Sequence, residues 1–262
     1  MKEEIRIFFT ALMFYTRISC PKNIDHDEEY INKATRYFPL IGWIVGTISY
    51  FVFLISNFLF EINIAIIFSL LSGVLVTGAF HEDGLADVFD GFGGGWTKAK
   101  ILEIMKDSRI GTYGVIALIF LFLVKYYSLF GLFSKINLEN HFFVLLLFVA
   151  YHSLARLTAI NIVFTLQYAR EDETSKVKPI AKAYGYKEIA GTYFFGILPL
   201  ILLCFFQWKF SFVILPLFML YFYSRRYFAK WIGGYTGDCL GAVEQLAECV
   251  CLLTFLVLWK FT

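Results

Sequence analysis

Charged residues, paired cysteines and long polar stretches are scarce in this sequence. Asp, Glu, Lys and Arg make up 17% of its 262 residues, against about 25% in an ordinary soluble domain. The five cysteines show neither metal-ligand spacing nor a disulfide framework, which argues against a small secreted fold held by cross-links. A net charge of +2 is too small to indicate nucleic-acid binding. No internal repeat, low-complexity tract or cleavable signal peptide is evident.

Apolar residues are abundant instead, and they come in long runs. Hydrophobic residues make up 59% of the chain and aromatic residues 20%. A helix needs roughly 20 apolar residues to cross the hydrocarbon core of a bilayer. The predicted crossings are 39–59, 62–80, 113–133, 141–166, 189–206, 210–223 and 240–258. The sequence therefore predicts an all-α, polytopic membrane protein with about seven transmembrane helices.

The chain 1–262 is expected to form a single integral membrane domain. Its N-terminal segment, 1–35, contains an amphipathic stretch from Lys2 to Arg17 that we expect to lie in the membrane interface. If the crossings alternate, 18 of the 23 Lys and Arg residues fall on one side of the membrane and 3 on the other. Basic loops are retained inside. We therefore expect a cytoplasmic N-terminus and cytoplasmic catalytic loops at 81–111 and 224–241.

Three aspartates in segment 81–91 have a spacing that puts them on one face of a helix. Asp83, Asp87 and Asp90 stand at positions i, i+4 and i+7. Two carboxylates 4 Å apart repel by about 4 kcal/mol at an effective dielectric constant near 20, so a cation is needed beside them. Clustered oxygen ligands suit Mg²⁺, Mn²⁺ or Ca²⁺. The three residues are the candidate metal ligands and catalytic residues; the alternative is an acidic helix end in solvent.

A glycine and a charged turn accompany these aspartates. Gly84 has no side chain and would allow a substrate or a neighbouring helix to approach closely. Farther along, Lys106, Ser108 and Arg109 are candidate ligands for a substrate phosphate. Asp107 is a candidate catalytic base or additional metal ligand. The alternative for this turn is a charged anchor just before the third crossing.

Polar residues also open the last predicted crossing. Thr236, Gly237 and Asp238 stand where a helix is expected to begin. Bare N–H groups at a helix N-terminus favour an anion such as phosphate, so all three are candidate substrate-binding residues. A simple capping role for Asp238, with no substrate involved, is the alternative.

Several ionisable residues lie within or next to the predicted crossings. Carboxylates at membrane depth are rare without a partner, and Glu244 and Glu248 lie inside the last crossing. Arg156, inside the fourth crossing, is the expected partner of these carboxylates or a substrate-binding residue. Arg36, before the first crossing, either binds substrate at the same site or anchors its helix. His81 is expected to be a structural histidine.

Four segments, 36–42, 81–91, 104–114 and 236–242, resemble the cobalamin synthase family. The resemblance spans nearly the whole chain with the motifs in order. It implies a prokaryotic cytoplasmic membrane enzyme that depends on Mg²⁺. It also implies the substrates adenosylcobinamide-GDP and α-ribazole or its 5′-phosphate, with GMP as the leaving group. The bilayer is the expected surrounding, and the sequence permits an oligomer.

Other membrane proteins share parts of this pattern. The aspartate segment is distantly similar to that of the CDP-alcohol phosphotransferases, but Asp87 follows the alanine where that family has arginine. Prenyltransferases also bind Mg²⁺ through aspartates, and they usually carry a second aspartate motif that is missing here. A cation transporter would carry its carboxylates near the bilayer midplane in two related halves. These classes stay as alternatives at this point.

Overall fold

The computed structural model describes residues 3–21, 28–170 and 184–261. These residues form helices joined by short connections, and they contain no β-sheet. The first six helices are α1 (Glu3–Tyr15), α2 (Glu28–Ala34), α3 (Phe38–Leu59), α4 (Ile62–Thr77), α5 (Phe80–Gly94) and α6 (Lys98–Ile104). The others are α7 (Thr112–Phe133), α8 (His141–Val163), α9 (Tyr186–Cys204), α10 (Ile214–Ile232) and α11 (Gly237–Trp259). Two 3₁₀ helices, η1 (Thr35–Tyr37) and η2 (Trp208–Val213), complete the fold, and the all-α prediction is confirmed.

Several helices are long and apolar enough to cross a membrane, which fits an integral membrane protein. Five pass this test: Glu29–Leu59, Thr112–Phe133, His141–Val163, Tyr186–Cys204 and Gly237–Trp259. The pair α4 and α5 adds a sixth if it is taken as one bent span. Helix α10 has 19 residues, but its second half carries Arg225, Arg226 and Lys230. Counting α10 as well gives the seven predicted crossings.

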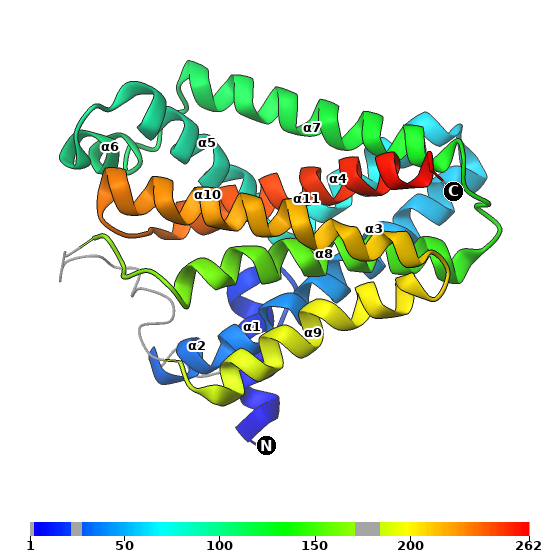
Figure 1. The fold of residues 1–262 in the computed structure, drawn as a ribbon, viewed down its shortest axis with the longest axis horizontal. Coiled ribbons are helices and arrows are strands. Elements are labelled where there is room, and N and C mark those ends of the chain that lie inside the picture. The colour runs from blue at the N-terminus through cyan, green and yellow to red at the C-terminus, as the bar shows by residue number, and fades with distance from the viewer. Residues whose placement is uncertain (1–2, 22–27, 171–183, 262) are drawn as a thin grey trace.

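Helix α8 is the centre of the bundle and is buried along almost its whole length. Figure 1 shows α3, α9, α10 and α11 arranged around it, with α7 farther out. Large apolar side chains on the outer faces of α7 and α10, such as Phe120 and Leu215, stay exposed. An apolar outer surface of this kind suits contact with lipid.

The chain bends sharply between α4 and α5, where the sequence predicted one straight crossing over 62–80. The axes of the two helices differ by 89°. Gly78 and Ala79 both adopt left-handed backbone angles, with φ of 70° and 58°. For alanine this conformation costs roughly 1–2 kcal/mol. The backbone N–H of Arg17 supports the bend by donating to the carbonyl of Val76 at 2.7 Å.

The polar connections lie at one end of the bundle. Figure 1 shows α2, α5 and α6 at that end, together with the C-terminal ends of α8 and α10. Helix α1, predicted to lie in the interface, buries Ile7, Ala11 and Tyr15 in the protein core. The connection between α8 and α9 includes the segment 169–187, which contains five Lys and Arg residues; most of this segment lies outside the described residues.

Candidate active site

Helix α5 and the start of α11 approach closely because each has a glycine at the contact. A Cβ atom on Gly84 would lie 2.9 Å from the backbone oxygen of Asp238. A Cβ atom on Gly241 would lie 3.0 Å from the backbone oxygen of His81. Any larger residue at either position would push the helices apart. This contact brings α5, which carries Asp83 and Asp87, beside the first turn of α11.

Asp83, Asp87 and Asp238 form what we call the aspartate cluster. The charges that act on Asp87 include the carboxylates of Asp238 and Asp83 and the guanidinium of Arg170. Asp83 is exposed, whereas Asp87 and Asp238 are half-buried. The Oδ2 atom of Asp238 lies 2.9 Å from Nη2 of Arg170, the one cation paired with the cluster among the described residues. Within the described structure, three carboxylates therefore face one positive charge at a site open to water.

A short backbone pairing puts Arg170 beside Asp238. The segment after α8 pairs with the segment before α11: Ala169 N–H donates to the Tyr235 carbonyl at 2.8 Å, and Tyr235 N–H donates to the Gln167 carbonyl at 3.0 Å. This pairing is long-range in sequence. The sequence did not identify Arg170 as a site residue, because a local motif gives no sign of its partner.

Thr236, rather than Asp238, caps the last helix. The buried Oγ1 atom of Thr236 accepts a hydrogen bond from the backbone N–H of Cys239 at 3.3 Å. The carboxylate of Asp238 is thus available to Arg170. A Cβ atom on Gly237 would meet nothing within 4 Å, so the helix start borders open space. The roles of these three residues in binding substrate stay predictions.

Asp90, the third predicted metal ligand, has a structural task. Its Oδ2 atom accepts a hydrogen bond from Gly111 N–H at 2.7 Å, and its Oδ1 atom accepts one from Gly114 N–H at 2.9 Å. These donors are the otherwise unsatisfied N–H groups at the start of α7. Asp90 therefore caps α7 from a neighbouring helix. Its role as a metal ligand stays a prediction that competes with this function.

The charged turn between α6 and α7 contains a local ion pair. Arg109 donates from Nη2 to Oδ2 of Asp107 at 2.6 Å, and both side chains are accessible to solvent. The bound guanidinium lowers the pKa of Asp107 to about 2. A carboxylate with so low a pKa is a weak base. Lys106 and Ser108 are both exposed in this turn.

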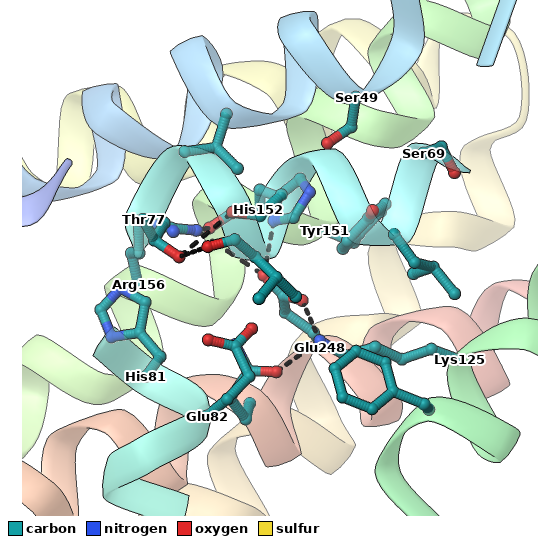
Figure 2. Close-up of a pocket in the computed structure, with 16 residues that line it drawn as sticks. Ser49, Ser69, Thr77, His81, Glu82, Lys125, Tyr151, His152, Arg156 and Glu248 are labelled. Atoms are coloured by element: carbon teal, nitrogen blue, oxygen red, sulfur yellow. Dashed lines mark hydrogen bonds and ion pairs between the residues drawn. The ribbon is translucent and has the colours of Figure 1, made fainter. Parts of the chain in front are cut away.

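A second charged group lies inside the bundle, and we call it the buried network (Figure 2). Arg156 lies 2.8 Å from Glu244, and Lys125 lies 2.6 Å from Glu248. His152 is paired with the other oxygen of Glu248. All five side chains are buried. The predicted pairing of Arg156 with carboxylates of the last helix is therefore present.

Arg156 was also a candidate substrate-binding residue. Its side chain is 1% exposed, and its Nη1 atom contacts Glu244 and the carbonyl oxygen of His152. The structure thus brings it into the buried network and not into the aspartate cluster. A direct contact with a phosphate would require these buried pairs to open.

Glu82 and His81 connect the two groups, because they begin the same helix as the cluster aspartates. Both side chains are buried and line the small cavity that also borders Lys125 and Glu248. Figure 2 shows the carboxylate of Glu82 directed into this cavity. Helix α5 therefore turns one face to the buried network and carries Asp83 and Asp87 on another.

Arg36 holds the N-terminal helices in place. Its guanidinium pairs with Glu188 of α9 and lies 2.8 Å from Glu4 of α1. The hydroxyl of Tyr37 also donates to Glu4, at 2.8 Å. The side chain of Arg36 is buried in these contacts. Its predicted role in binding substrate has no support from this geometry.

Two groups of carboxylates can be compared as metal sites. Among the described residues, only His152, Glu244 and Glu248 have three ligand atoms that all lie within 4.8 Å of one another. Lys125 and Arg156 already neutralise those carboxylates. The aspartate cluster is more open, but Mg²⁺ typically binds one or two carboxylates and completes its shell with water and substrate phosphate. Mg²⁺ therefore fits the aspartate cluster better.

Comparison with known proteins agrees with the predicted resemblance. The family model described as cobalamin-5-phosphate synthase matches residues 7–256. A protein of Shewanella oneidensis named adenosylcobinamide-GDP ribazoletransferase is 40% identical over 259 residues, which cover 97% of this chain and 95% of that protein. A protein of the same name from Shewanella pealeana is 42% identical over 258 residues, covering 98% of this chain and 97% of that protein.

No solved structure matches this chain. The family model and the relatives nonetheless cover it almost from end to end, including α5, α8 and α11. The chain belongs to the cobalamin-5-phosphate synthase family.

Proposed function

We propose that this chain joins adenosylcobinamide-GDP to α-ribazole, or to its 5′-phosphate, in a Mg²⁺-dependent phosphotransfer. The names of the relatives supply the donor substrate and the type of acceptor. The observation that carries the proposal is the aspartate cluster: three carboxylates at the polar end of a helical bundle, with Arg170 as the one cation paired with them in the described part of the chain. Such a site is suited to a divalent cation and a phosphate substrate.

The reaction is a displacement at phosphorus. An acceptor hydroxyl oxygen forms a bond to the phosphorus linked to cobinamide, and the bond from that phosphorus to the bridging oxygen breaks. The bridging oxygen leaves with GMP. The hydroxyl proton passes to a carboxylate of the aspartate cluster. The products are adenosylcobalamin, or its 5′-phosphate, and GMP.

Different residues of the chain bind the metal ion and the substrate phosphates. Asp83, Asp87 and Asp238 would hold a Mg²⁺ ion, which when bound would supply positive charge against the diphosphate and the departing GMP. Lys106 and Arg109 orient the substrate phosphates from the turn before α7. The low pKa of Asp107 keeps it ionised and leaves the role of base to the cluster.

The membrane placement is part of the proposal. The polar end of the bundle faces the cytoplasm of a prokaryote, where nucleotide substrates are available, and the N-terminus lies on the same side. The distribution of Lys and Arg supports this orientation. The surrounding bilayer contacts the exposed apolar faces of α7 and α10.

The direct test is release of GMP from adenosylcobinamide-GDP by purified protein in lipid nanodiscs. We expect release only when both Mg²⁺ and the ribazole acceptor are present. Chelation of Mg²⁺ should stop it, and Mg²⁺ added back should restore it. Acceptor-independent release, or no release with intact protein, would contradict the proposed function.

A further inference from the structure

Basic side chains gather in a cleft beside the aspartate cluster. The cleft has a volume of about 440 Å³ and lies between α6 and the segment that follows α8. Lys98, Lys106 and Arg170 contribute positive charge to its wall. Among the described residues of the wall, Glu103 is the one acidic side chain, and it pairs with Lys100 at 2.9 Å. The described part of the wall therefore carries more basic than acidic side chains, and the volume of the cleft is in the usual range for a small ligand, roughly 300–1,000 Å³.

Arg170 joins this cleft to the aspartate cluster. Its Nη2 atom is 2.9 Å from Oδ2 of Asp238, while the same residue lines the cleft. The Nε atom of Arg170 is buried and has no hydrogen-bond partner. A guanidinium can bind two anionic groups at once through its fork of donors. Arg170 can thus stay paired with Asp238 and at the same time donate hydrogen bonds to a phosphate.

The cleft also has an apolar part. Ala99, Leu102 and Ala169 line it between the basic side chains. A ligand that combines phosphate with a flat, less polar group matches this lining better than a free inorganic anion does. A nucleoside monophosphate has this combination.

We propose that the cleft of Lys98, Lys106 and Arg170 binds the phosphate of the nucleotide that leaves in the reaction. This inference rests on the proposed function and adds the site of the leaving group. Arg170 binds that phosphate beside Asp238, and the two lysines supply charge from the opposite wall. The nucleotide is therefore held next to the carboxylates while the acceptor takes its place at phosphorus.

The test is GMP binding measured by calorimetry in zwitterionic nanodiscs with chelator present, so that neither turnover nor Mg²⁺ contributes. We expect Arg170→Gln to weaken GMP binding by about 10-fold or more and Lys98→Gln to weaken it by about 3-fold, because charge-assisted phosphate contacts are lost. Arg170→Lys should be weakened less than Arg170→Gln. Guanosine, which lacks the phosphate, should bind wild-type protein and Arg170→Gln equally weakly.

The control is Lys135→Gln. Lys135 is an exposed lysine in the connection between α7 and α8 and does not line the cleft. We expect its GMP affinity and its turnover to equal those of the wild type. Lys98 is also exposed, so its substitution tests the cleft even if the Arg170 variants fold poorly.

Two results would overturn the inference while leaving the proposed function intact. One is equal GMP affinity in wild type, Lys98→Gln and Arg170→Gln, with wild-type turnover normal. The other is absence of GMP binding combined with an Arg170-dependent preference for anionic over zwitterionic lipid, which would assign the cleft to lipid phosphate. Loss of turnover in the wild type would instead contradict the proposed function itself.

Discussion

The aspartate cluster and the buried network are two acidic groups in one molecule, and they handle charge differently. In the buried network, Glu244 and Glu248 face Arg156 and Lys125, so the protein supplies its own cations. In the aspartate cluster, Arg170 is the one cation that the described residues 3–21, 28–170 and 184–261 pair with three carboxylates, and these carboxylates remain partly open to water. Carboxylates that are already paired with cations of the protein have a structural role. Carboxylates that are not fully paired are available to a ligand that supplies positive charge, such as a metal ion.

The largest effect on activity is expected when a carboxylate is removed from the aspartate cluster. We expect Asp87→Asn to reduce GMP release by roughly 10²–10³-fold or more, because charge stabilisation at the transferring phosphorus is lost. Its melting temperature should stay within a few degrees of the wild type, since two neighbouring carboxylates no longer repel it. Near-normal turnover would exclude Asp87 from the metal site.

Removal of a carboxylate from the buried network should instead lower the stability of the protein. Glu248→Gln leaves Lys125 and His152 buried without their anion, which should cost about 3–5 kcal/mol. We expect a strongly lowered melting temperature in detergent and poor yield. Glu139→Gln, at an exposed position between α7 and α8, is the control and should melt like the wild type. A Glu248→Gln protein as stable as this control would show that the buried pairs carry no net stability.

Asp90 combines features of both groups: it was predicted as a metal ligand, and it makes structural hydrogen bonds at the start of α7. Asp90→Asn retains one acceptor oxygen but loses a charge-assisted hydrogen bond at the start of α7, which should cost about 1–2 kcal/mol. We expect a modest fall in melting temperature and a smaller loss of turnover than in Asp87→Asn. Equal losses of turnover in the two variants would support the original prediction that Asp90 is a metal ligand.

The smallest effect is expected at Asp107. Because Arg109 lowers its pKa to about 2, Asp107 stays ionised at all pH values above that value. Any stability that the pair contributes is present above the ordinary aspartate pKa and is lost as the pH falls toward 2. Between pH 5 and 9, Asp107→Asn should therefore show a pH–rate profile of unchanged shape. A displaced acidic limb would make Asp107 the catalytic base.

The helical class and the site segments could be predicted from the sequence because they depend on local patterns. Long apolar runs indicate crossings, and the i, i+4 spacing of Asp83 and Asp87 puts them on one helix face. The pairing of Arg156 could also be predicted, because carboxylates inside an apolar helix require a partner.

Other features depend on contacts that a local pattern does not encode. Asp90 accepts hydrogen bonds from Gly111 and Gly114, which lie 21 and 24 residues farther along the chain. Arg170 reaches Asp238 through a backbone pairing between distant segments. The bend at Gly78 and Ala79 was missed because a glycine near a helix end also occurs in straight crossings. Local sequence patterns do not determine which residues distant in the sequence come into contact.

Binding of Mn²⁺, a paramagnetic substitute for Mg²⁺, tests most directly whether the aspartate cluster holds a divalent cation, and it can be followed by electron paramagnetic resonance in nanodiscs. We expect the wild-type protein to bind the ion and Asp87→Asn to weaken binding by about 10-fold or more through loss of a charged ligand. Asp90→Asn should weaken it far less. Equal Mn²⁺ affinity in wild type and Asp87→Asn would show that Asp87 is not a metal ligand.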